Sequence, residues 1–153
     1  MATSSTSTDV WAAIAAGAAA ESPLWAESLR ADPEREPVFS PLVHERYALG
    51  LETIYEGYLL HYGRPRLFAP PDADLALLAG DYLYAHGLAR IAALGELDAV
   101  AAFAELISTC AALRADGRPG DGEAWVELAR QLGGGNHAEA VAQALVAHAA
   151  RVD

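Results

Sequence analysis

The sequence contains no lysine and only one cysteine, and both features limit what the chain can do. All ten basic residues are arginines, against 21 acidic residues, so the formal net charge is −11. A surface this acidic argues against nucleic acid or an anionic membrane as a partner, because both are negatively charged. The single cysteine, Cys110, cannot form an internal disulfide, which is typical of a reducing compartment and predicts a cytoplasmic protein.

Long hydrophobic runs and alternating β-branched segments are also missing. The longest apolar stretches are mostly alanine and fall short of the roughly 20 residues that a membrane-spanning helix needs, so no transmembrane segment is expected. Alanine, the strongest helix former, occupies 35 of the 153 positions. That length suits one domain with its own core. The composition therefore predicts an all-α protein, organised as a helical bundle.

Helix start and stop signals divide the chain into four parts. Residues 1–8 are small, polar and uncharged, and we expect a flexible N-terminus there. Residues 9–40 contain short helices, the first capped by Asp9, and a proline-rich connector. Residues 41–115 are the expected core helical region, and residues 116–153 the C-terminal helices, with a flexible joint at 133–136.

The long helices are expected near residues 40–62, 99–114 and 137–151, with another from residue 72 or 74 to 94 and a shorter one at 123–132. Ser40 and Pro41 are the expected start of the first of them. Apolar positions surround the helix at 99–114 almost entirely. This pattern predicts a place in the middle of the bundle or in an oligomer interface.

Three residues near the middle of the chain have side chains that metals bind. Glu52 and Glu56 are four residues apart, and His61 follows five residues later. Helical two-metal sites need a matching carboxylate pair and a Glu-x-x-His spacing, and neither occurs here. We therefore interpret Glu52 and Glu56 as a solvated helix face, and assign no metal ligand, catalytic residue or cofactor.

Tyr55 and Tyr58 share one side of the first long helix with Tyr62. Such a stripe either belongs to the core, with its hydroxyls at the rim, or lines an apolar ligand pocket together with Tyr84. Cys110 has no base nearby in the sequence and is expected to be a small buried hydrophobe.

Arg64 and Arg66 flank a proline at the expected end of the same helix. These guanidinium groups could bind a diphosphate or a partner's carboxylate, or could contact the last carbonyls of the helix. Gly80 and Gly87 are seven residues apart on the next helix and therefore share a face. Because glycine costs about 1 kcal/mol in a helix interior, this pair predicts close packing against a neighbour.

Residues 77–88, LLAGDYLYAHGL, resemble the helix of trans-polyprenyl diphosphate synthases that carries the sequence LAGDYLLARAL. The similarity continues to about residue 108. Upstream, residues 51–61 resemble the helix that ends in the first aspartate-rich motif of that family, and Gly63-Arg64-Pro65 resembles the segment beyond it. The match covers about residues 49–113 and implies a bundle that resembles part of the isoprenoid synthase fold.

The sequence differs from that family at the residues that the family's catalytic chemistry needs. His61-Tyr62-Gly63 stands where the family has His-Asp-Asp, and the sequence has no Asp-Asp pair anywhere. Prenyl transfer needs Mg²⁺ ions held by two aspartate-rich motifs, and Asp81, which matches a motif aspartate, cannot assemble such a cluster alone. The family's diphosphate-binding lysines have no counterpart. The resemblance therefore implies a protein that has lost prenyltransferase activity.

Two main functions follow as hypotheses. One is a non-catalytic accessory subunit, a homo- or hetero-oligomer in which the face of Gly80 and Gly87 buries a partner, with a catalytic prenyl synthase subunit as candidate. The alternative is a small-molecule binder that takes an isoprenoid or quinone-like chain. The candidate binding residues are Tyr55, Tyr58, His61, Arg64, Asp81 and Tyr84. A metal-dependent enzyme using Glu52, Glu56, His61 and Asp81 is a less favoured third hypothesis.

Overall fold

A computed structural model describes residues 9–134 and 137–152. These residues form seven α-helices and two 3₁₀ turns, and no strand occurs among them beyond one isolated bridge between Leu29 and Phe68. The prediction of an all-α fold is confirmed. Within the described ranges, no helix combines the length and the apolar character needed to cross a membrane. The expected flexible N-terminus, residues 1–8, lies outside the described residues.

Side-chain caps fix where several helices begin. The helices are α1 (Val10–Glu21), α2 (Pro23–Glu27), α3 (Ala48–Tyr62), α4 (Ala73–Ala92), α5 (Leu97–Ala115), α6 (Asp121–Gln131) and α7 (Ala138–Val152). Asp9 accepts a hydrogen bond from the backbone N–H of Ala12, and Asp72 accepts one from Leu75. Both carboxylates satisfy an N–H group that has no partner inside its helix.

The first long helix begins later than predicted. Ser40–Leu42 and Glu45–Tyr47 form two 3₁₀ turns separated by extended backbone, and α3 starts only at Ala48. The reason is that the Ser40 hydroxyl does not cap a helix. It donates to the Glu52 carboxylate, 2.6 Å away, and so holds the preceding segment against the side of α3.

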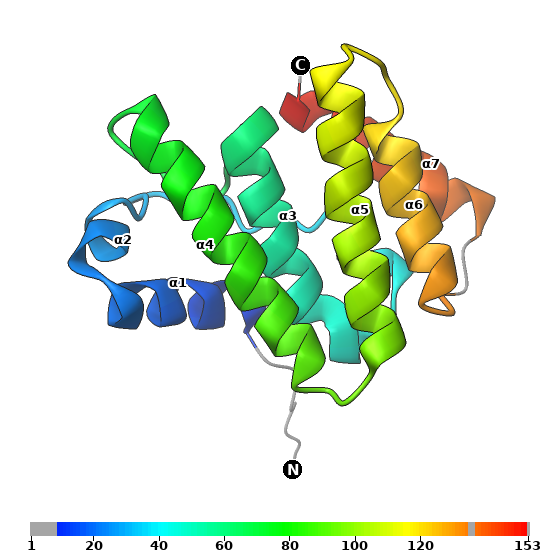
Figure 1. Cartoon of the computed structure of the whole chain (residues 1–153), viewed down its shortest axis with the longest axis horizontal. Helices are drawn as coiled ribbons and strands as arrows, with labels where there is room; N and C mark the ends of the chain where they lie inside the picture. The colour runs from blue at the N-terminus through cyan, green and yellow to red at the C-terminus, as the bar shows by residue number, and fades with distance from the viewer. Residues whose placement is uncertain (1–8, 135–136, 153) are drawn as a thin grey trace.

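The central helix of the bundle is α3. It packs along the length of α4 (Figure 1), and every residue from 50 to 60 is buried. Residues 99–114 therefore do not occupy the middle of the bundle, the first of their two predicted places: α5 buries one stripe, Ala99, Phe103, Leu106 and Cys110, and its opposite face is exposed. The second predicted place, an oligomer interface, stays a prediction. The apolar positions that surround α5 are largely alanines, which are small enough to remain at a surface.

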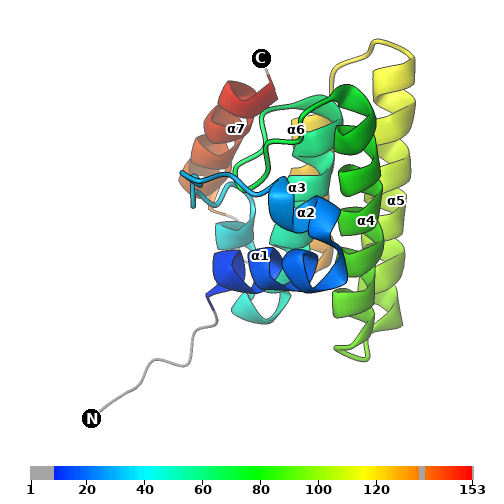
Figure 2. The same cartoon turned by 90° about the vertical axis from the view of Figure 1, so that its left-hand side faces the viewer.

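Two apolar clusters lie on opposite sides of α3. The larger joins α3 to α5, α6 and α7 and includes Tyr55, Tyr58, Phe103 and Trp125. The smaller packs α1, α2 and the first half of α4 around Leu60. Figure 2 shows α1 and α2 on the side of the bundle away from α6.

Glycines bring α3 and α4 into close contact. A Cβ atom at Gly87 would lie 2.4 Å from Ile54, and one at Gly57 would lie 2.9 Å from the carbonyl oxygen of Gly80. The neighbour that the spacing of Gly80 and Gly87 predicts is thus α3 of the same chain. Both glycines are buried there, so this face is not open to a partner.

The glycine segment before α7 is partly packed. A Cβ at Gly134 would lie 2.0 Å from the carbonyl oxygen of Leu42, and the Gly134 N–H donates to the carbonyl of Ala129. The rest of the expected joint, Gly135 and Asn136, lies outside the described residues.

Candidate functional site

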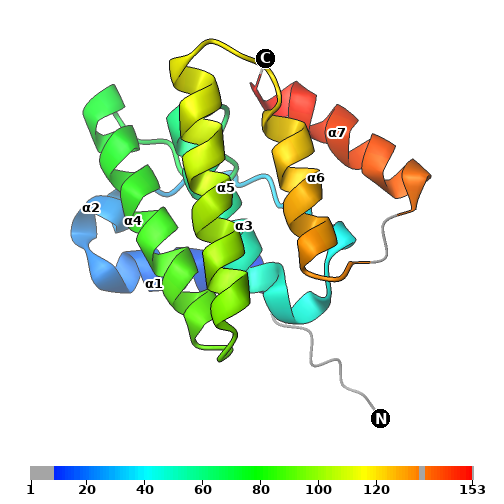
Figure 3. The same ribbon diagram turned by 45° about the vertical axis from the view of Figure 1, so that its right-hand side comes forward.

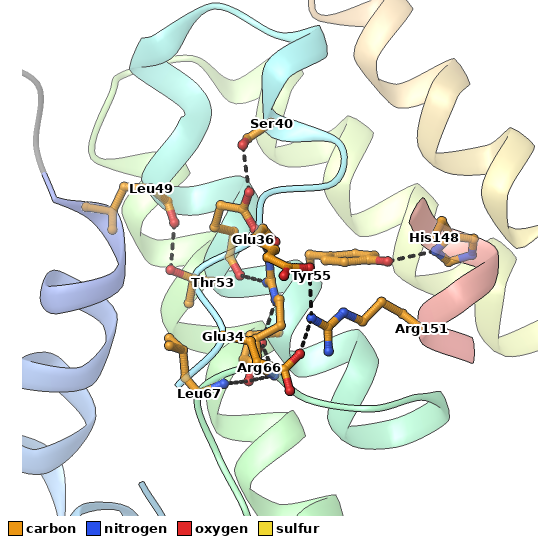
Figure 4. Close-up of polar contacts among 12 residues, drawn as sticks. Glu34, Glu36, Ser40, Leu49, Thr53, Tyr55, Arg66, Leu67, His148 and Arg151 are labelled. Atoms are coloured by element: carbon orange, nitrogen blue, oxygen red, sulfur yellow. Dashed lines mark hydrogen bonds and ion pairs between the residues drawn. The ribbon is translucent and has the colours of Figure 1, made fainter. Parts of the chain in front are cut away.

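Arg66 is the centre of a buried polar cluster (Figure 4). Its side chain is fully buried, with Nη1 2.6 Å from Oε1 of Glu52 and Nε 3.0 Å from Oε1 of Glu56. Glu56 also accepts hydrogen bonds from the backbone N–H groups of Arg66 and Leu67. The prediction that Glu52 and Glu56 form a solvated face is wrong, because both side chains are 0% exposed.

The same cluster reaches the C-terminal helix. The Arg66 guanidinium lies 5.0 Å from the ring centre of Tyr55, whose hydroxyl is 2.8 Å from Nδ1 of His148. Arg151 donates to Oε1 of Glu34 at 2.5 Å and to the carbonyl of Arg64. These bonds fasten α7 to the 34–36 and 64–66 segments, and their burial makes the cluster a structural element rather than a site open to substrate.

A cavity lies beside this cluster, lined by residues of the α5–α6 loop, the start of α6 and the end of α7. Figure 3 shows the α5–α6 loop next to the end of α7. The volume of the cavity is about 560 Å³, within the usual range for small-molecule sites. One wall is apolar and consists of Leu145, Ala149 and Val152 on α7. The facing wall carries the charges of Arg114, Arg118, Asp121 and Glu123, and His148 also lines the cavity.

A hydrogen-bonded triad links two residues of the charged wall, Arg114 and Asp121, to Tyr58 behind it. Asp121 accepts from the Tyr58 hydroxyl and from Nε of Arg114 through the same oxygen, Oδ2, and Nη2 of Arg114 donates to the Tyr58 hydroxyl. The other oxygen, Oδ1 of Asp121, is buried and has no hydrogen-bond partner among the residues that the structure describes. Burial raises the pKa of the Tyr58 phenol, and its bond to Asp121 raises it further. Tyr58 is therefore held protonated, as a donor.

The predicted tyrosine pocket has a different arrangement. Tyr55 and Tyr58 are 0% and 1% exposed, and neither lines the cavity. Their hydroxyls instead contact two residues that do line it, His148 and Asp121. The tyrosines thus position the wall of the cavity and do not form its surface.

His61, Asp81 and Tyr84 lie together, at a distance from the cavity lining. Nε2 of His61 is 3.1 Å from Oδ1 of Asp81, without the alignment of a hydrogen bond, and the Asp81 side chain is 73% exposed. The rings of His61 and Tyr84 are 5.0 Å apart. This group forms part of the contact between α3 and α4.

Arg64 binds the end of α7. Its Nη2 donates to the carbonyl oxygen of Ala150, so the carbonyls it contacts are not those of its own preceding helix. Arg64 also lines a shallower hollow of about 390 Å³ with Arg30, Leu60 and Phe68. Arg66, which the sequence analysis paired with Arg64, is buried and cannot reach a diphosphate.

The four residues of the metal-enzyme hypothesis do not converge. Arg66 and backbone N–H groups engage the carboxylates of Glu52 and Glu56, whereas His61 and Asp81 pair with each other. Among residues 9–134 and 137–152, no group of three or more His, Cys, Asp or Glu side chains is placed to hold a metal ion.

Cys110 lies on the buried side of α5. Burial raises the pKa of its thiol to about 12, so the thiolate is scarce at neutral pH. We expect iodoacetamide at pH 8 to modify native Cys110 at least about 100-fold more slowly than Cys110 in concentrated urea. Mass spectrometry of timed samples measures both rates. Equal rates would show an accessible, reactive thiol and contradict this burial.

The residues that line the cavity were missed by the sequence analysis. Arg114 ends the helix expected at 99–114, Arg118 and Asp121 lie between it and the helix expected at 123–132, and His148 lies in the helix expected at 137–151. The available signal was local: two arginines, two glycines and a proline immediately precede a helix. Comparison of the chain with protein-family models, with curated proteins and with solved structures gives no match.

Proposed function

We propose that the chain is a non-catalytic binding protein that holds a small amphipathic molecule between the α5–α6 loop and α7. The observation that carries this proposal is the cavity of about 560 Å³, with an apolar wall facing a charged one. A site of this kind buries the body of a ligand against Leu145, Ala149 and Val152 and orients its polar group at the opposite wall.

The groups around the cavity favour binding over catalysis. The hydroxyls of Tyr55 and Tyr58 are buried, and burial raises the pKa of both, so neither serves as a base near neutral pH. Asp121 is already engaged by Arg114 and Tyr58. The hydrogen bonds among Arg114, Tyr58 and Asp121 therefore fix the positions of these side chains.

Filling the cavity tests this proposal. Ala149 is an exposed residue of α7 that lines the cavity, and Ala142 is an exposed residue of the same helix that does not. In a ligand-observed NMR screen of small amphipathic fragments, we expect Ala149→Trp to abolish the binding seen with the native protein, because the indole occupies the cavity.

The matched variant Ala142→Trp should retain that binding. If no fragment binds the native protein, or if fragments bind Ala149→Trp equally well, the cavity is not a ligand site and the proposal fails.

The accessory-subunit hypothesis is the second candidate. It is favoured by Leu77 and Leu78, adjacent residues of α4 that are 51% and 55% exposed. The other exposed large apolar residues of the described chain are dispersed over α2, α5 and α7. If this candidate is correct, the native mass of the protein from its own host includes a partner, and Leu78→Asp releases it. A monomeric mass that the substitution does not change would argue against it.

A further inference from the structure

The hollow that Arg64 lines together with Arg30 lies where the segment between α3 and α4 meets the residues that follow α2. Its volume is about 390 Å³, within the range of small-molecule sites, and it shares no lining residue with the cavity between the α5–α6 loop and α7. The floor is apolar: Leu60 and Phe68 belong to the smaller apolar cluster and are 7% and 2% exposed. The other apolar lining residues are Pro65, Ala69, Pro70 and Ala76.

A short antiparallel bridge places Arg30 at this hollow. Leu29 pairs with Phe68, and a backbone hydrogen bond of 2.8 Å joins the Arg30 N–H to the segment of Phe68. The Arg30 side chain then reaches the residue next to Arg64, because its Nη1 donates to the carbonyl oxygen of Pro65 at 3.3 Å. Backbone pairing thus brings two arginines that are far apart in the sequence to one hollow.

Both guanidinium groups keep donors for a ligand. Among the described residues, the Arg64 side chain makes one hydrogen bond, to the carbonyl of Ala150, and Arg64 is exposed. The Arg30 side chain is 31% exposed and forms an ion pair with Glu34 at 3.4 Å. Because a guanidinium group carries five N–H donors, these contacts hold each arginine in place and leave several of its donors unused.

The charged residues that line this hollow, among those that the structure describes, are both basic. The cavity beside α7 and two smaller hollows between α5 and α6 each have two carboxylates in their lining. In a chain with 21 acidic residues and ten arginines, a lining with two cations and no carboxylate is unexpected. Glu34 does not neutralise it, because Arg30 shares this carboxylate with Arg151, which binds the other oxygen at 2.5 Å.

We propose that this hollow binds a small organic carboxylate with an apolar body, at a site separate from the cavity of the proposed function. The carboxylate accepts hydrogen bonds from Arg30 and Arg64, since the planar guanidinium group matches its two oxygens. The body packs on Leu60 and Phe68. Two cations beside an apolar floor suit a single negative charge, whereas a phosphate monoester carries up to about two at neutral pH.

Three matched probes test this proposal with the full chain at pH 7. They are 4-phenylbutyrate, its uncharged amide 4-phenylbutanamide, and 3-phenylpropyl phosphate. Titrations followed by ¹H–¹⁵N NMR give each dissociation constant. We expect 4-phenylbutyrate to bind about tenfold more tightly than the amide, because hydrogen bonds to a charged acceptor are about twice as strong as neutral ones. The phosphate should bind no more tightly than 4-phenylbutyrate.

The expected dissociation constant of 4-phenylbutyrate is roughly 0.1–1 mM, since charges that remain partly in solvent contribute little to affinity. Such a complex dissociates during purification. Arg64→Gln and Arg30→Gln should each weaken it about tenfold, because each substitution removes one cation from the hollow. The control is Arg130→Gln, which changes the net charge equally. Arg130 is exposed on α6, outside the lining of this hollow, so its substitution should leave the affinity unchanged.

Equal affinities of 4-phenylbutyrate and its amide, tighter binding of the phosphate, or no binding by 4-phenylbutyrate would overturn this inference. Arginine substitutions at 30 and 64 that have no more effect than Arg130→Gln would also overturn it.

Ala149→Trp separates this inference from the proposed function. Ala149 lines the cavity beside α7 and not this hollow, so Ala149→Trp should leave the affinity for 4-phenylbutyrate unchanged. If the substitution abolishes that binding, the carboxylate occupies the cavity beside α7; the proposed function then stands, and this inference fails. Fragments without an acidic group report on that cavity alone, so the two experiments can fail independently.

Discussion

Replacing Arg66 by methionine is expected to lower the free energy of unfolding by about 3–5 kcal/mol, because the substitution leaves two buried carboxylates without their cation. Both Glu52 and Glu56 are 0% exposed, and the Arg66 guanidinium contacts each of them. A loss of this size is a large part of the total stability of a domain of this length. Urea unfolding followed by circular dichroism at 222 nm measures it.

Arg64 provides the matched control two residues earlier. It is exposed, and its guanidinium binds one carbonyl, that of Ala150. Arg64→Met should lower the free energy of unfolding by about 1 kcal/mol or less. Equal effects of the two substitutions would contradict the assignment of Arg66 as the cation that neutralises the buried carboxylates of α3.

Gly80→Leu is expected to destabilise the protein by about 3 kcal/mol, since the contact of α3 and α4 leaves no room for a side chain. A Cβ at this position would lie 2.7 Å from Nε2 of His61 and 3.1 Å from the backbone oxygen of Gly57. A leucine there must displace the His61 ring and still meets the Gly57 carbonyl oxygen. Thermal and urea unfolding measure the loss.

Ala85→Leu, on an exposed position of the same helix, is the control and should change stability by about 0.5 kcal/mol or less. Gly134→Ala does not serve as a neutral control, because its Cβ would meet the carbonyl oxygen of Leu42. If Gly80→Leu were as mild as Ala85→Leu, the close approach of α3 and α4 would be wrong.

Local signals in the sequence predicted most of the helices, although α3 begins at Ala48 and not near Ser40. Asp9 and Asp72 cap α1 and α4 where the pattern of residues indicated, and the alanine content predicted the all-α class. The spacing of Gly80 and Gly87 indicated a close approach, although the neighbour proved to be α3. Features that depend on i, i+3 and i+4 spacing or on one cap are readable because they involve residues close together in the chain.

The burial of α3 on all sides could not be predicted from the sequence of the helix alone. Glu52 and Glu56 have the spacing of an exposed face. Their burial depends on Arg66, held beyond the turn that ends α3, and on donors from Ser40 and the Leu67 backbone. The cavity also depends on residues from several separate segments. Its walls come from the end of α5, the start of α6 and the end of α7, with Tyr58 of α3 behind them. Because these segments are far apart in the sequence, no local pattern predicts that their side chains line one cavity.

The most direct test of the central claim is native mass spectrometry of the protein purified gently from its own host, together with Ala149→Trp prepared in the same way. We predict that the native protein retains a small molecule and that Ala149→Trp, with a filled cavity, does not. A protein that carries no ligand, or a ligand that remains bound to Ala149→Trp, would contradict the assignment of this cavity as the functional site.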